Sequence, residues 1–141
     1  MENRELIVKN AREYVYDALN NEGSGHDWWH VFRVTNNAIE IAKYEEADIY
    51  ICELAALLHD IADGKLNESE EAGQKRVYTW LVDNGVSSET LDHVMDIVSK
   101  MSFKGGNQKE NVSTLEGKIV QDADRLDAMG AIGIARVMCY S

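Results

Sequence analysis

A histidine and an aspartate stand side by side at the end of an apolar run, in the segment ELAALLHDIADGK that spans residues 53–65. His59 and Asp60 directly follow residues of the kind that fill a protein core. A buried carboxylate is costly unless a cation or several hydrogen bonds compensate it. The segment therefore indicates that positive charge lies beside Asp60.

A second segment, KIVQDADRLDAMGAIGIA, places three carboxylates within six positions among apolar and small residues. On a helix Asp124 and Asp127 would share a face because they are three residues apart, whereas Asp122 would point away from Asp124. The small residues would let neighbouring helices approach closely, which suits a site assembled between helices. Asp124 and Asp127 are therefore the candidates for one site.

Four side chains, those of His30, His59, Asp60 and Asp124, form a candidate metal constellation. Two imidazole nitrogens and two carboxylate oxygens suit Mn, Fe, Co, Ni or Zn and are too rich in nitrogen for calcium. Adjacent helical residues point about 100° apart, so His59 and Asp60 can converge on one ion only at a helix end or through the reach of their side chains. Gly64 predicts such an end.

The spacing of apolar residues predicts helix almost throughout the chain, which contains no proline. We expect helices at about residues 3–21, 28–45, 48–62, 69–84, 88–101 and 114–138. N-caps are expected at Asp27, Ser87 and Ser113, the last in capping-box spacing with Glu116. The pattern predicts an all-α fold, a compact helical bundle in which residues 1–141 form one domain with a metal site between helices.

The chain carries 25 acidic and 14 basic residues, a formal net charge of −11. This balance argues against duplex nucleic acid or an anionic membrane as a partner, because both need a basic surface. Small phosphorylated substrates remain compatible with it. The two cysteines, Cys52 and Cys139, offer no disulfide framework, and no apolar run approaches the roughly 20 residues that span a bilayer. We expect a cytoplasmic protein whose core is anchored by Trp28, Trp29 and Trp80.

Four sequence motifs stand out, and three of them contain the candidate ligands: GHDWWHVFRV (25–34), ALLHDIADGK (56–65), MSFKGG (101–106) and VQDADRLDAMGAIGIAR (120–136). Together and in this order they resemble the HD-domain metal-dependent phosphohydrolases, most closely a bacterial branch that includes manganese-dependent nucleoside triphosphate pyrophosphatases. The resemblance implies that the metal ligands are His30, His59, Asp60 and Asp124. It also implies one divalent transition metal, with Mn favoured and Fe, Co, Ni, Zn or Mg as alternatives.

The family often carries an acid three residues after its His-Asp pair, and Asp63 occupies that position. We expect Asp63, together with Asp60, to be catalytic, with Asp63 as proton shuttle or water-orienting base and a structural salt bridge as its alternative. Substrate phosphates are expected to meet five side chains: His26, Arg33, Lys65, Lys104 and Arg125. Three residues are expected to contact the metal ligands and orient them without binding the ion: Asp27, His93 and Asp127. Alternatives stay open for several of these residues. Arg33 could pair with an acid near the metal, Asp27 could only cap its helix, and His93 could simply pack. His26 could be a solvated histidine, and the remaining three cations could be ordinary surface residues: Lys65, Lys104 and Arg125.

The motifs predict a hydrolase in which the ion activates water and polarises a phosphoryl oxygen. Three nearby cations outnumber what a monophosphate requires, which favours a nucleoside triphosphate cleaved to monophosphate and pyrophosphate. The alternatives are a nucleotide phosphatase or phosphodiesterase of the same superfamily, or a module that binds metal or nucleotide without turnover. A two-metal phosphodiesterase would need several histidines between Asp60 and Asp124, where only His93 occurs. Members of the branch usually continue beyond GAIGIAR, and an exposed apolar end, IGIARVMCY, would favour a homodimer.

Overall fold

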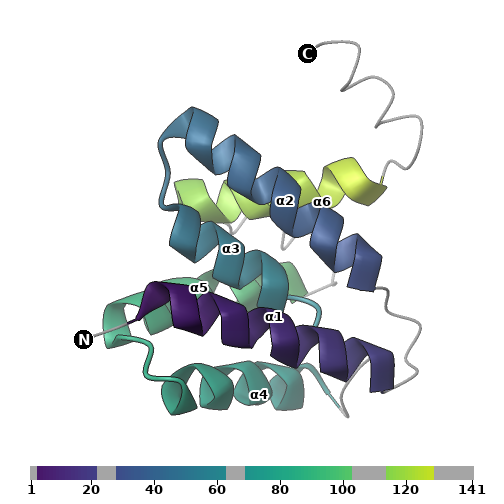
Figure 1. The fold of residues 1–141 in the computed structure, drawn as a ribbon, viewed down its shortest axis with the longest axis vertical. Coiled ribbons are helices and arrows are strands. Elements are labelled where there is room, and N and C mark those ends of the chain that lie inside the picture. Colours follow the sequence, from purple (N-terminus) through teal and green to yellow (C-terminus); the bar gives the residue numbers. More distant parts are fainter. Residues whose placement is uncertain (1–2, 22–27, 63–68, 103–113, 129–141) are drawn as a thin grey trace.

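The computed structural model describes residues 3–21, 28–62, 69–102 and 114–128 (Figure 1). Within these ranges the chain forms six helices: α1 (Arg4–Asn21), α2 (Trp28–Glu45), α3 (Ile49–Leu58), α4 (Glu70–Asp83), α5 (Ser88–Ser102) and α6 (Leu115–Ala128). Each helix lies where the sequence predicted one, and the described residues contain no β-strand, so the predicted all-α fold is confirmed. The predicted helical residues 129–138 lie outside the described part of the chain.

Helix α3 is the central helix, and it packs against α1, α2, α5 and α6. Figure 1 shows it between α1 and α2. Eight of its ten residues are buried, so nearly every face of the helix is covered. Its cysteine, Cys52, is a fully buried free thiol. Because α3 is enclosed in this way, the residues that directly follow Leu58 are also buried.

Helices α2 and α6 pack along each other in opposite directions (Figure 1). The first turn of α2 contacts the last turn of α6 through His30 and Asp127. At the other end, Glu116 in the first turn of α6 accepts a hydrogen bond from the backbone N–H of Asp48, just beyond the end of α2. The antiparallel packing therefore brings the start of α2 to the acidic end of α6.

Side-chain caps mark where the helices begin. Asp48 caps α3 by accepting hydrogen bonds from the N–H groups of its second and third residues. Ser87 caps α5, as predicted, and accepts from the N–H three residues later at 3.3 Å. Thr114 caps α6, because its Oγ1 accepts from the N–H of Gly117 at 3.0 Å. The predicted caps Ser113 and Asp27 lie outside the described residues, so the predicted capping box of Ser113 with Glu116 stays a prediction.

Two of the three tryptophans anchor the core as predicted. Trp28 and Trp80 are partly buried and pack against it, and Trp80 stacks on Tyr14 with ring centroids 5.6 Å apart. The prediction is wrong for Trp29, which is 60% exposed. Neighbouring residues on a helix point in different directions, so burying Trp28 turns Trp29 outward.

No helix in the described part of the chain combines the length and the hydropathy that are needed to cross a bilayer.

Candidate metal centre

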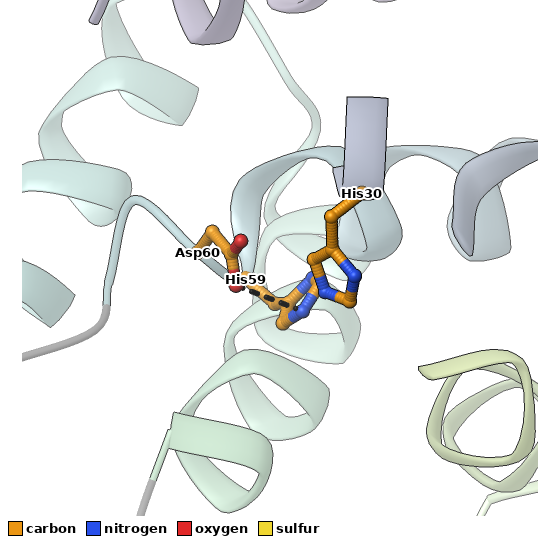
Figure 2. Close-up of side chains that lie close together, drawn as sticks. All are labelled: His30, His59 and Asp60. Carbon is orange, nitrogen blue, oxygen red and sulfur yellow. Dashed lines mark ion pairs between the residues drawn. The ribbon is translucent and has the colours of Figure 1, made fainter. Parts of the chain in front are cut away.

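Three predicted ligands come together where the first turn of α2 meets the turn after α3 (Figure 2). His30, His59 and Asp60 each offer one ligand atom, and these atoms all lie within 4.8 Å of one another. Figure 2 shows the two imidazole rings next to each other, with the Asp60 carboxylate beside His59. Two imidazoles converging with a carboxylate are a plausible set of donors for a transition metal.

His59 and Asp60 lie in the turn that directly follows α3. The helix ends at Leu58, four residues before the predicted end at residue 62. After it, the N–H of Ile61 donates to the carbonyl of Leu58, three residues back, at 3.1 Å. The N–H of Ala62 donates to the same carbonyl at 3.4 Å, and His59 keeps α-helical backbone angles. His59 Nε2 lies 3.1 Å from Asp60 Oδ1, and both residues are buried.

Asp124 of α6 adds a second carboxylate to the group. Its Oδ1 lies 3.2 Å from His30 Nε2 and 3.5 Å from His59 Nε2. The structure thus brings together all four side chains that the sequence predicted as ligands. They come from α2, from the turn after α3 and from α6, so the group depends on the packing of all three segments.

Both imidazoles turn Nε2 toward Asp124, while Nδ1 of each ring contacts a different group. Nδ1 of His59 donates to the backbone carbonyl of Ala56, one helical turn earlier, at 2.7 Å. Nδ1 of His30 lies 2.5 Å from Asp127 Oδ2. Such contacts leave Nε2 as the nitrogen available to a metal. Sequence reasoning missed the role of Ala56 because no residue type marks a backbone carbonyl.

The carboxylates favour the protonated, positively charged form of the two histidines. A hydrogen bond with Asp124, opposed in part by burial, raises the pKa of His30 to about 9. Burial disfavours the charged form of His59, but Asp60 and Asp124 outweigh burial and raise the pKa of His59 well above its ordinary value. Burial alone would raise the pKa of Asp124, yet hydrogen bonds with the two histidines hold that pKa well below its usual range. A divalent cation held by the same atoms would replace the imidazole protons, so the donor set fits such an ion.

Arg33 and Asp127 contact each other beside His30. Asp127 Oδ1 lies 2.5 Å from Arg33 Nε, and Asp127 Oδ2 lies 3.1 Å from Arg33 Nη2. The hydrogen bonds from Arg33 lower the pKa of the Asp127 carboxyl, although burial opposes them. Of the two roles expected for Arg33, the structure therefore displays pairing with an acid near the predicted ligands.

Two further predicted residues make other contacts. Arg125 is exposed on α6, with Nη1 3.8 Å from Asp122 Oδ1. His93 was expected to support the ligands, but its Nε2 lies 3.6 Å from Glu116 Oε1. Glu116 precedes Asp124 by eight residues, a helical rise of about 12 Å. The expectation for His93 is therefore wrong, because α5 meets the start of α6 instead of its acidic end.

Five predicted residues lie outside the described part of the chain: His26, Asp27, Asp63, Lys65 and Lys104. Their expected roles stay predictions.

Sequence comparison identifies a family whose model matches most of the chain. The profile of the HD domain family matches residues 28–129. The chain is 48% identical over 136 residues to the protein YpgQ of Bacillus subtilis (strain 168), covering 95% of this chain and 66% of YpgQ. It is 29% identical over 153 residues to protein L803 of Acanthamoeba polyphaga mimivirus, covering 98% of this chain and 61% of L803. The chain therefore spans somewhat less than two thirds of the length of these relatives.

Solved structures share the fold. A crystal structure of Bacillus subtilis YpgQ in complex with ADP superposes with a TM-score of 0.75 at 40% identity, covering 97% of this chain and 66% of that one. The structure of an HD-superfamily hydrolase from Bacillus thuringiensis gives a TM-score of 0.77 at 45% identity, covering 98% of this chain and 66% of that one.

Proposed function

Because the chain belongs to the HD domain family, we propose that it is a metal-dependent hydrolase of phosphorylated nucleotides. The observation that carries the proposal is the group of His30, His59, Asp60 and Asp124, in which two anchored imidazoles face two carboxylates. The complex of YpgQ with ADP supports a nucleotide as the ligand. The preferred substrate is a nucleoside triphosphate, whose hydrolysis between the α- and β-phosphates gives a monophosphate and pyrophosphate.

The four side chains would hold one divalent transition metal. Manganese is the proposed ion, and Fe, Co, Ni, Zn or Mg are the alternatives. Such an ion supplies Lewis-acid activation of water and of a phosphoryl oxygen. The protein contributes the orientation of the donors, since the carbonyl of Ala56 holds the ring of His59 with Nε2 toward Asp60 and Asp124.

Other residues of the chain would position the substrate and move protons. Asp63, three residues after Asp60, is proposed to accept the proton of the attacking water. Lys65, Lys104 and Arg125 are proposed to bind phosphate oxygens and to stabilise the charge that develops on them. Three positive charges suit a triphosphate better than a monophosphate.

Phosphorus NMR of the products tests both the activity and the bond that breaks. The Mn²⁺-loaded protein is incubated separately with dATP, dADP and dAMP. We expect dATP to yield dAMP and pyrophosphate. Inorganic phosphate released with dADP or deoxyadenosine would show a phosphatase instead. Calorimetric binding of dATP without any product would show a module that binds nucleotide and does not turn over.

A matched pair of variants separates the site from general effects on the protein. Asp124→Ala removes one proposed ligand and is expected to abolish turnover and metal binding together. Asp92→Ala makes the same chemical change at an exposed position of α5 and is expected to leave both unchanged. Full activity in Asp124→Ala would contradict the proposed site, whatever the substrate.

A further inference from the structure

His30 and His59 are anchored in different ways, although both turn Nε2 toward the acids. His59 uses the carbonyl three residues earlier, which belongs to its own helix. His30 is the third residue of α2, so the carbonyl three positions earlier precedes the helix. A local anchor of the kind that holds His59 is therefore not available from α2 itself. The corresponding contact of His30 comes from another helix, through Asp127 of α6.

The Asp127 carboxylate is itself held on both oxygens. Oδ1 accepts a hydrogen bond from Arg33 Nε at 2.5 Å, and Oδ2 lies 3.1 Å from Arg33 Nη2 and 2.5 Å from His30 Nδ1. The side chain of Asp127 is only 6% exposed, so its orientation is confined. A guanidinium that bonds both oxygens of a carboxylate adds geometric precision that a single contact lacks.

The spacing of the residues explains why the contacts form together. His30 and Arg33 are three residues apart on α2, and Asp124 and Asp127 are three residues apart on α6, so each pair shares a helix face. Antiparallel packing places the two faces against each other. The two nitrogens of His30 are then divided between the two acids, with Nε2 toward Asp124 and Nδ1 toward Asp127.

We propose that Asp127 and Arg33 are positioning residues for His30. Asp127 holds the ring in the orientation that aims Nε2 at the metal, and Arg33 holds Asp127. The permanent positive charge of Arg33 also compensates the nearly buried carboxylate. The inference depends on the proposed function only in that a metal binds at this site. It gives Arg33 a role in metal binding instead of substrate binding.

Mn²⁺ affinity measured by calorimetry without nucleotide tests the inference. Asp127→Ala is expected to weaken Mn²⁺ binding by about 10–100-fold, the usual effect of removing such a partner. Arg33→Met is expected to weaken it in the same direction, and Arg33→Lys to restore it only in part because an ammonium cannot span both oxygens. The control, Lys43→Met, removes an exposed cation of the same helix that pairs with Glu40 and should change nothing.

A second measurement observes the ring directly. In the Zn²⁺-loaded protein, two-bond ¹H–¹⁵N spectra should show His30 with its proton on Nδ1, and Asp127→Ala should reduce that population. Circular dichroism verifies that each variant is folded, and Arg33→Lys carries the test if Asp127→Ala does not fold.

Two results would overturn the inference. One is unchanged Mn²⁺ affinity in folded Asp127→Ala. The other is a raised KM for dATP at saturating Mn²⁺ in Arg33→Met with unchanged Mn²⁺ affinity, which would make Arg33 a substrate contact. Because metal binding is measured without nucleotide, an absence of hydrolysis would refute the proposed function and leave this result intact.

Discussion

Replacing Thr35 by valine should stabilise the protein. Thr35 lies within α2, is 0% exposed, and its Oγ1 atom has no hydrogen-bond partner in the described part of the chain. A buried hydroxyl without a partner costs about 1–3 kcal/mol, because it loses its bonds to water and gains none. Valine has nearly the same shape and helix propensity, so the change opens no cavity and leaves the helix intact.

The expected gain in the free energy of unfolding is about 1–2 kcal/mol. Unfolding entropy scales with chain length, so each kcal/mol should raise the Tm of a chain of this size by about 3.4 °C. The variant should therefore melt about 3–7 °C higher than the wild type. Urea unfolding followed by circular dichroism gives the free energy, and equal m-values would show that the denatured states are comparable.

Thr79→Val is the matched control, because it makes the same change at an exposed position of α4. Its effect should stay within about 0.5 kcal/mol of zero, as for most surface substitutions. All measurements use protein treated with a chelator, since bound metal would shift every midpoint. If Thr35→Val destabilised the protein by about 1 kcal/mol or more while Thr79→Val did not, the hydroxyl would have a partner after all, such as an internal water.

Four further outcomes are expected. His59→Ala and Asp60→Ala should each lose stoichiometric metal by elemental analysis, and chelation should lower the Tm of the wild type; full metal content in both variants would refute the ligand assignment. Asp63→Asn should keep its metal but turn over about 10²–10⁴-fold more slowly, whereas a loss below about fivefold would indicate a structural salt bridge. Burial raises the pKa of Cys52 from 9.0 to about 12. Because the unfolded thiol ionises first, stability should fall as pH rises above 9; urea unfolding at pH 8 and 10 checks this, and Cys52→Ala should show a smaller fall.

The sequence determined the helices and the types of residue in the candidate site. Apolar spacing of the helical period is a local property, so it located all six described helices. Most of their ends lie within a few residues of the predicted positions. The spacing placed the end of α3 four residues too late, because beyond Leu58 the chain forms a turn in which Ile61 and Ala62 both donate to the carbonyl of Leu58. It also counted Trp29 as core, although that side chain is 60% exposed. Adjacent helical residues point about 100° apart, and on the one-sided helix α2 it is Trp28 that packs on the core.

Only the tertiary structure decided which atoms meet. Spacing placed Asp124 and Asp127 on one face of α6, but it could not show that one faces Nε2 of His30 and the other faces Nδ1. That division follows from the antiparallel packing of α2 on α6, which joins residues almost a hundred positions apart. The same packing turned Arg33 to Asp127, whereas the position of α5 took His93 to the other end of α6. Residue types and local periodicity are carried by the chain itself, while the pairing of distant side chains depends on how the helices pack.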